Sequence, residues 1–482
     1  MSELPLDLDE PDEPDDPQPV GARISNFLTH QLDRLQPSSQ LVLVVTALVV
    51  GIGAGIGAVI FRYLINGVQW IGYVWFPNIT VDWGKAYVII VPAIGGLLVG
   101  PLVYFFAREA KGHGVPEVME AVALKGGRIR PRVAIVKSFA SALSIGSGGS
   151  VGREGPIVQI GSALGSTLGQ VLNLSEDRVR NLVACGAAGG IAATFNSPIA
   201  GVIFALEIFL GEFTIHGFST VVISSVAASV IGRVAFGDIP AFVIPTEYGI
   251  SSLWEYIFFA VLGVLTALFG VLYTRSIYFA EDLFERWKRV PEWLKPAVGG
   301  ALLGIFAFAY PAITGVTWED YPPIFNVGYQ VIEMALDNQV LLWTAIVLLF
   351  AKIIATSLTL GSGGSGGVFA PSLFVGAMLG AAYELVLKNF FPNIIAPQGA
   401  YAIVGMAALF AASAHAPITA VIILFELTGD YRLILPLMLT VVLATMISRH
   451  LMKGESIYTL KLSRRGVTLN RGRDIDLKEA VV

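Results

Sequence analysis

The feature that most constrains this chain is a series of long apolar stretches that fills residues 40–452. Only 14% of the residues are charged, against about 25% in soluble domains, so a soluble globular enzyme is excluded. Several stretches approach the roughly 20 residues that a helix needs to cross a bilayer. These candidate spans are residues 41–67, 86–107, 217–236, 254–278, 294–312, 340–360 and 432–452. The sequence predicts an all-helical, polytopic membrane protein.

Shorter apolar segments, many of them interrupted by Gly and Pro, lie between these spans. They cover residues 115–124, 156–171, 181–194, 198–210, 368–388, 400–413 and 417–427. Broken or half-length helices are tolerated at membrane depth only when they pack inside the protein or line a cavity. A transport pathway would need such segments, whereas an ordinary receptor-like bundle would not.

The charged residues are placed unevenly along the chain. Residues 1–20 carry eight acids, no bases and five prolines, which is typical of a flexible, solvated tail. The basic segments at residues 125–132 and 286–289 and after residue 453 are candidate cytoplasmic segments, so both termini are predicted to be cytoplasmic. With five His and one Cys, no Cys/His metal framework is expected, and we expect no cofactor and no nucleic-acid partner.

Two pairs of similar segments divide the membrane body into related halves. Residues 146–152 (GSGGSVG) resemble residues 361–367 (GSGGSGG), and residues 185–207 resemble residues 404–426, which pairs Glu207 with Glu426. Related halves are common in secondary transporters. We therefore predict a disordered acidic tail over 1–22, membrane repeats over 23–240 and 241–452, and a cytosolic tail over 453–482.

Three Gly-rich turns lead into Pro and then into an apolar segment, at residues 112–116, 152–156 and 366–371. Pro is well tolerated in the first turn of a helix, and Gly lets the backbone turn tightly and leaves N–H groups uncovered. The start of a helix carries a partial positive charge and free donors. Several such starts that converge would bind an anion without a full positive charge, which suits an ion that must also leave.

These motifs closely resemble the CLC family of chloride channels and chloride/proton antiporters over about residues 40–460. The resemblance rests on GREGP at 152–156, GGVFAPSL at 366–373 and the GxGVPE form at 112–117. It implies two inverted-topology repeats with many short or tilted helices, and a homodimer with one anion pathway per subunit. It also implies chloride, and in some members protons, as the transported ions. The nucleotide-binding domains that follow the membrane part of many relatives are not expected here.

The resemblance also implies roles for individual residues. Glu154 matches the gating glutamate, whose carboxylate competes with chloride for the same donors. Val368 and Phe369 match the backbone groups that coordinate the anion, and Tyr458 matches a coordinating tyrosine. The turns add Gly155 and Gly367 to the expected chloride-binding set.

Two positions depart from the family pattern. His113 stands where the family has a coordinating serine, so we expect an altered or pH-sensitive anion site, unless the imidazole turns toward a backbone carbonyl. Ile208 stands where antiporters have an internal proton-transfer glutamate, and an aliphatic side chain cannot carry a proton. The neighbouring Glu207 could substitute, although structural hydrogen bonds are the expected role of Glu207 and Glu426.

The sequence therefore predicts chloride transport by a protein that is not an enzyme. Ile208 favours passive, channel-like conduction gated by Glu154. Proton-coupled chloride antiport is the alternative, because other antiporters lack the acid and water can replace it. An intramembrane serine protease is a remote alternative, since Ser150 and Ser365 both fit G-x-S-x-G and His415 or His113 could act as base.

Overall fold

The computed structural model describes residues 39–79, 81–211, 215–238, 240–242, 248–250, 252–318 and 321–467. Within these ranges the regular elements are helices, joined at two points by isolated β-bridges. The acidic tail predicted over 1–22 lies outside the described residues, as does the C-terminal tail beyond residue 467.

The first half combines long spans with shorter inner segments. They are α2 (Ser39–Trp70), α3 (Phe76–Ile79), α4 (Tyr87–Pro101), α5 (Val115–Leu124), α6 (Arg132–Gly146), α7 (Glu154–Val171), α8 (Glu176–Phe195), α9 (Pro198–Phe204) and α10 (Ile215–Phe236). A π-helical turn over Ala205–Leu210 continues α9.

The second half likewise combines long and short helices. Its helices are α11 (Glu255–Arg286), α12 (Lys295–Thr314), α13 (Tyr329–Leu336), α14 (Leu342–Gly361), α15 (Phe369–Lys388), α16 (Gln398–Ala414), α17 (Pro417–Thr428), α18 (Ile434–Leu451) and α19 (Thr459–Arg464). Each of the seven predicted spans corresponds to a long helix, namely α2, α4, α10, α11, α12, α14 or α18.

The described residues contain one further helix that is long and apolar enough to span a membrane. It is α15, whose glycines made it look broken in the sequence. Instead they serve packing against α16. A Cβ at Gly376 would lie 2.3 Å from the carbonyl oxygen of Gly405, and one at Gly380 would lie 2.0 Å from that of Tyr401. Pro371 lies in the first turn, where it costs no hydrogen bond, so the helix is continuous.

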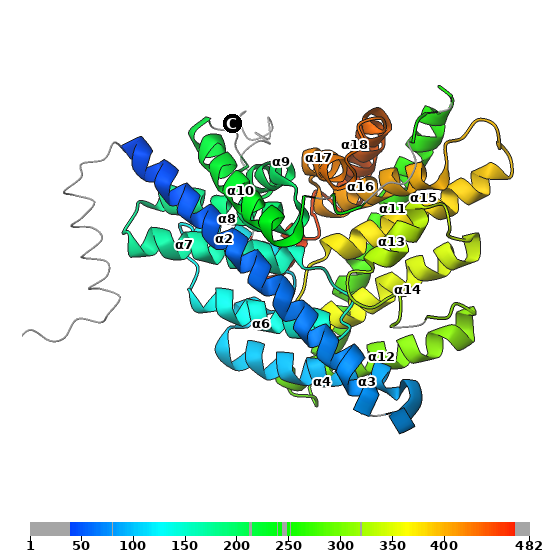
Figure 1. Cartoon of the computed structure of the whole chain (residues 1–482), viewed down its shortest axis with the longest axis horizontal. Coiled ribbons are helices and arrows are strands. Elements are labelled where there is room, and N and C mark those ends of the chain that lie inside the picture. Colours follow the sequence, from blue (N-terminus) through cyan, green and yellow to red (C-terminus); the bar gives the residue numbers. More distant parts are fainter. Residues whose placement is uncertain are drawn as a thin grey trace, which may run out of the picture.

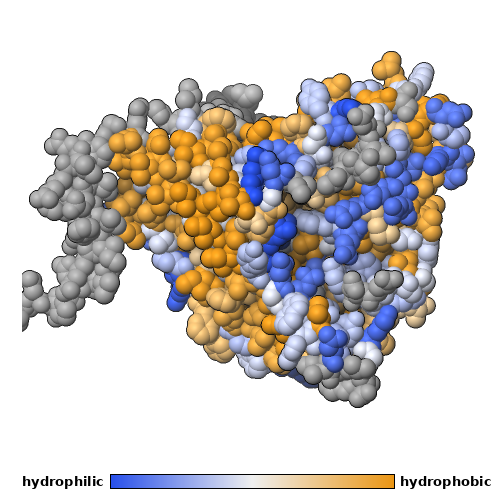
Figure 2. Space-filling model, viewed as in Figure 1, coloured by the Kyte–Doolittle hydropathy of each residue, from blue (hydrophilic) through white to orange (hydrophobic). Residues whose placement is uncertain are grey.

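The outer helices present apolar side chains to their surroundings. The long helix α2 crosses the molecule diagonally (Figure 1) and packs on α8 and α10, while α4 packs on α12. A broad hydrophobic area covers the same side of the molecule (Figure 2). Its exposed residues on α2 include Leu41, Val44, Val45, Leu48, Val49, Ile52, Ile56 and Ile60. Such a surface is stable against lipid rather than water, as expected for a multi-pass membrane protein.

Reciprocal hydrogen bonds between equivalent residues link the two halves. Gly152 and Gly367 occupy equivalent places in the sequence repeat, and they exchange both backbone hydrogen bonds in an antiparallel bridge, at 2.8 and 2.6 Å. The carboxylate of Glu207 accepts hydrogen bonds from two first-turn amides of α17, at 3.2 and 2.8 Å. The equivalent Glu426 accepts from two first-turn amides of α9, at 2.9 and 2.7 Å. Reciprocal bonds between equivalent residues agree with the predicted inverted repeats and confirm structural hydrogen bonds for both acids.

Candidate anion-binding site

The three Gly-rich turns meet at the interface of the two halves. The N–H of Gly112 donates to the carbonyl of Gly364 at 3.1 Å, and the N–H of Gly366 donates to the carbonyl of Gly112 at 3.2 Å. Together with the exchange between Gly152 and Gly367, these bonds hold the starts of α5, α7 and α15 side by side.

This close approach requires glycine. A Cβ at Gly155 would lie 1.9 Å from the carbonyl oxygen of His113, and one at Gly366 would lie 2.2 Å from a methyl group of Val151. Side-chain atoms do not approach other atoms at such distances, so any larger residue would push the turns apart. The spacing of the glycines in the sequence thus reflects a contact between segments that are distant along the chain.

The helix starts leave backbone donors available. None of α5, α7 and α15 has a side-chain hydrogen bond at its N-cap. The first N–H groups of a helix have no intrahelical partner, and they carry the positive end of the helix dipole. Three such starts that share one place favour a negatively charged ligand there.

A narrow cavity lies among these helix starts. Its volume is about 10 Å³, close to the least that holds one water molecule. It is lined by His113, Val115, Glu154, Gly155, Ile191, Phe195, Phe204, Val368, Phe369, Ile423 and Tyr458. Six of these residues were predicted from the sequence motifs. The other five are apolar, and nothing in the sequence distinguishes them from the many other apolar residues of this chain.

Gly367 was predicted to bind the anion directly, but it is not among the residues that line this cavity. It lies next to Glu154, since a Cβ at Gly367 would come within 2.9 Å of Oε2 of Glu154. One at Gly152 would come within 1.8 Å of the same oxygen. The two bridging glycines therefore make room for the carboxylate.

Glu154 is the first residue of α7, and only 5% of it is exposed. Neither of its carboxylate oxygens has a hydrogen-bond partner among the described residues. A buried carboxylate without a partner is costly. Here it lies at three helix starts, so a small anion and this carboxylate would compete for the same space and the same donors.

His113 and Tyr458 also line the cavity, and they come from distant parts of the chain. His113 is 3% exposed, and its Nδ1 has no partner among the described residues. This nitrogen therefore makes no hydrogen bond to a backbone carbonyl of the described residues. Tyr458 is 2% exposed and directly precedes α19. The hydroxyl of Tyr278 anchors this segment by donating to the carbonyl of Ile457 at 2.5 Å.

Phe369, the first residue of α15, combines two functions. Its side chain packs on the rings of Phe410 and Phe195, with centroids 4.6 and 5.8 Å away. These contacts fix the start of α15, and with it the backbone N–H groups of Val368 and Phe369 beside the cavity. The side chain of Phe369 therefore belongs to the core.

Two buried lysines position the site and were missed in the sequence. The ammonium group of Lys137 on α6 donates to the carbonyls of Ala110 and Gly112, at 3.0 and 2.7 Å. The equivalent Lys352 on α14 donates to two carbonyls in the turn before α13, at 3.1 and 2.7 Å. Both are fully buried. The signal was a lysine inside an apolar stretch at the same place in both repeats.

Ile208, the position without the proton-transfer acid, lies in the π-helical turn after α9 and is 2% exposed. The adjacent acid, Glu207, also accepts a hydrogen bond from the hydroxyl of Thr419, at 2.6 Å. The carboxylate is thus held by the start of α17.

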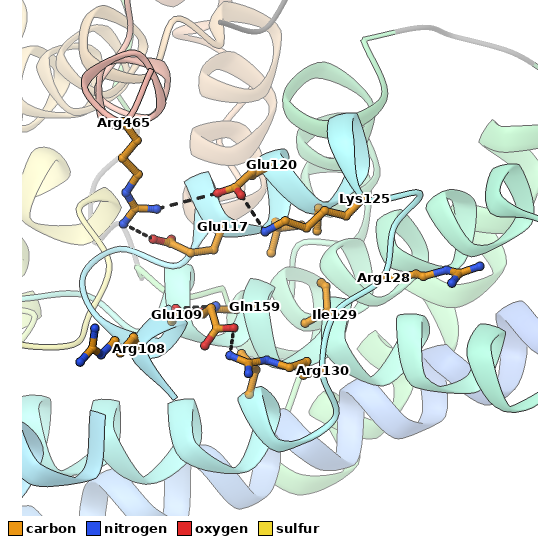
Figure 3. A pocket seen from close by; sticks show the side chains of 13 residues that line it. Arg108, Glu109, Glu117, Glu120, Lys125, Arg128, Ile129, Arg130, Gln159 and Arg465 are labelled. Atoms are coloured by element: carbon orange, nitrogen blue, oxygen red, sulfur yellow. Dashed lines mark hydrogen bonds and ion pairs between the residues drawn. The ribbon is translucent and has the colours of Figure 1, made fainter. Parts of the chain in front are cut away.

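A second cavity, of about 450 Å³, lies beside α5 and α19 (Figure 3). Its charged lining consists of Arg108, Glu109, Glu117, Glu120, Lys125, Arg128, Arg130 and Arg465. Glu117 is paired with Lys461 at 3.3 Å and with Arg465 at 3.2 Å. Burial acts to raise the pKa of Glu117, but Lys461 and Arg465 outweigh it and lower the pKa to about 2. The excess of basic groups favours anions near the start of α5.

The two G-x-S-x-G serines have structural partners. The hydroxyl of Ser150 lies 3.3 Å from that of Thr356, and the hydroxyl of Ser365 lies 2.9 Å from that of Ser141. Ser365 also donates to the carbonyl of Ala110 at 2.7 Å. These contacts tie the Gly-rich turns to α6 and α14, and they give neither serine the histidine partner of a hydrolase.

Comparisons with known proteins agree with this geometry. The sequence model of the family described as voltage gated chloride channel matches residues 95–449. An H+/Cl− exchange transporter ClcA of Vibrio cholerae is 38% identical over 373 residues, which is 75% of this chain and 76% of that protein. A ClcB-like chloride channel protein of Ralstonia nicotianae is 34% identical over 425 residues, which is 86% of this chain and 95% of that protein.

Among solved structures, a slow cyanobacterial Cl−/H+ antiporter superposes with a TM-score of 0.79 at 27% sequence identity. The match covers 89% of this chain and 98% of that one. The family match, the relatives and the helical architecture agree with the motifs of the Gly-rich turns. The chain is therefore an integral, multi-pass membrane protein that belongs to the CLC family of voltage-gated chloride channels and chloride/proton antiporters.

Proposed function

We propose that the protein exchanges chloride for protons across a membrane, and that Glu154 links the two ions. The observation that carries this proposal is the buried, unpartnered carboxylate of Glu154 at the meeting point of three helix starts. An ionised carboxylate competes with chloride for these donors. Protonation neutralises it and frees the donors, so that binding of a proton favours binding of chloride. Relatives named as exchange transporters and antiporters support the same function.

The other cavity residues have supporting roles in this proposal. The backbone N–H groups of Val368 and Phe369, with Gly155 of the gate turn, coordinate the anion. The imidazole of His113 donates a further hydrogen bond in place of the family serine, and Tyr458 contributes its hydroxyl to the same cavity. Gly367 leaves space for the gate.

Passive conduction through the same cavity is the second candidate. Ile208 favours it, because a buried aliphatic side chain offers no proton-accepting group at that position. The name of the ClcB-like relative also refers to a channel. The sequence favours passive conduction. The relatives named as exchangers give coupled exchange the better support, with water in place of the missing acid.

We further propose that the repeats divide between residues 240 and 241, that both termini are cytoplasmic, and that two copies form a homodimer with one pathway each. The organisation of the repeat-related helices, with α10 ending the first set and α11 opening the second, supports the division.

The function can be tested in liposomes that contain the purified protein and start without a pH gradient. An outward chloride gradient should drive protons into the vesicles against their own gradient once it forms, and a proton ionophore should abolish this movement. The matched variant Glu154→Gln should carry chloride without moving protons. If wild-type protein carries chloride but never moves protons uphill, the passive alternative replaces this proposal.

A further inference from the structure

Two cavities meet at a pair of arginines on the approach to the gate. One is about 680 Å³ and the other about 290 Å³, and both are lined by Arg62 of α2, Arg153 and Tyr329. Arg153 directly precedes Glu154, and Tyr329 is the first residue of α13. Arginine inside an apolar helix such as α2 is costly unless it faces a cavity or a partner. We call this region the Arg62–Arg153 mouth.

Aromatic rings hold both guanidinium groups. The Arg62 guanidinium lies 4.1 Å from the ring centroid of Phe236, and that of Arg153 lies 5.4 Å from Phe195 and 5.5 Å from Tyr329. A guanidinium that lies over a ring is held by its face, and its in-plane N–H groups remain free to donate. The buried Nε of Arg153 has no hydrogen-bond acceptor among the described residues.

Among the described residues, no acidic side chain lies within ion-pair distance of either cation. Within the described ranges, neither Arg62 nor Arg153 forms an ion pair, whereas the nearby Arg233 is paired with Asp238 at 3.3 Å. Glu333 lines the smaller cavity, but burial and then the neighbouring Asp337 raise its pKa. A guanidinium partner would lower it instead.

The Arg62–Arg153 mouth and the anion cavity suit different ligands, because their donor geometry and their size differ. Two planar guanidinium forks match the two oxygens of a carboxylate better than a spherical halide. The larger cavity also offers apolar contacts, from Ile65, Ile145, Val316, Val331, Met334 and Leu348. In contrast, the anion cavity of about 10 Å³ has no room for a carboxylic acid.

We propose that the Arg62–Arg153 mouth binds small aliphatic carboxylates, and that a bound carboxylate blocks the approach of chloride to Glu154. The binding site is independent of how chloride moves, while the block rests on the proposed transport function. A cell that accumulates such acids on this side of the membrane would thereby slow chloride transport without any change in the gate.

Equilibrium binding of radiolabelled hexanoate to the detergent-solubilised protein tests the site without any transport. Arg62→Gln should weaken binding about tenfold or more, because it removes a charge-assisted pair of hydrogen bonds. The control Arg233→Gln, which changes an arginine already paired with Asp238, should bind hexanoate like wild type. Arg62→Lys keeps the charge but lacks the fork, so it should recover only a small part of the affinity. Size-exclusion profiles confirm that each variant is folded.

Several results would overturn the site: equal hexanoate binding by wild type and Arg62→Gln, equal weakening by Arg62→Gln and Arg233→Gln, or displacement of hexanoate by uncharged hexanamide at similar concentrations.

The block is tested separately by chloride efflux from liposomes with hexanoate on both sides. Wild type should be inhibited, and Arg62→Gln should need about tenfold more hexanoate. If hexanoate binds but does not inhibit chloride efflux, the proposed block is wrong while the binding site stands. If proton coupling is not observed, the binding and efflux measurements can still be interpreted, because neither depends on proton movement.

Discussion

At the scale of single residues, the cavity around Glu154 depends on a few atoms in close contact. The carboxylate fits only because Gly152 and Gly367 have no side chain, and the donors around it come from backbone rather than from charged groups. His113 is the departure with the greatest consequence, since it brings an imidazole to a wall of the cavity. Its effect on anion binding can be isolated by substitution.

We predict that His113→Ala weakens chloride binding about two- to tenfold, the value of one hydrogen bond of about 0.5–1.5 kcal/mol. His113→Ser, which restores a donor, should recover most of the affinity. Isothermal titration of chloride into the purified protein measures both. Identical affinities for wild type and His113→Ala would remove His113 from the anion site.

Motifs predicted the polar members of the cavity but not its walls. Glu154, His113 and Tyr458 stand out in the sequence because polar groups are rare in this apolar body. Ile191 and Ile423 could not be predicted, because their place at the cavity depends on how α8 and α17 pack. Gly367 was predicted to bind the anion, and the structure shows in addition that its missing side chain leaves room beside Glu154.

At the scale of elements, charged side chains fix the ends of short helices. Glu207 and Glu426 each accept hydrogen bonds from the first amides of a helix in the other half. Glu117 in α5 pairs with Lys461 in α19, which joins the helix after His113 to the helix after Tyr458. Pairs of this kind hold together the segments that close the cavity.

Glu207→Gln should destabilise the protein by about 1–3 kcal/mol, because two amides and a hydroxyl lose a charged acceptor. The control Glu292→Gln, at an exposed site, should stay within about 0.5 kcal/mol of wild type. Apparent unfolding temperatures in detergent report the difference. Coupled proton movement should persist in Glu207→Gln; its loss in a variant of normal stability would make Glu207 a proton carrier instead.

The ion pair of Glu117 predicts a defined pH dependence. Its pKa of about 2 lies below the ordinary value of 4.5, so the pair stabilises the protein fully above about pH 4.5. The contribution declines as the pH falls toward 2, where the carboxylate becomes protonated. Glu117→Gln should cost about 3–5 kcal/mol near neutral pH, since it leaves the buried Lys461 without its charge partner. The difference between the unfolding temperatures of the two proteins should narrow as the pH falls from 4.5 to 3; a constant difference would contradict this assignment.

At the scale of the whole molecule, the two halves contact each other through their Gly-rich turns. The sequence repeats predicted two related halves, because equivalent motifs recur in the same order at nearly constant spacing, while their inverted arrangement was implied by the family resemblance. Apolar length predicted seven spans, but α15 was misjudged: in the sequence, glycines that serve packing cannot be distinguished from glycines that break a helix. Which equivalent residues bond to one another, as Glu207 and Glu426 do reciprocally, emerged only from the fold.

The most direct test of the central claim, that Glu154 links chloride to protons, is the voltage at which current through the reconstituted protein reverses. Under equal chloride gradients, imposing a pH gradient should shift the reversal voltage of wild type away from the chloride equilibrium value, and Glu154→Gln should show no shift. A wild-type reversal voltage that stays at the chloride equilibrium value at every pH gradient would contradict the account.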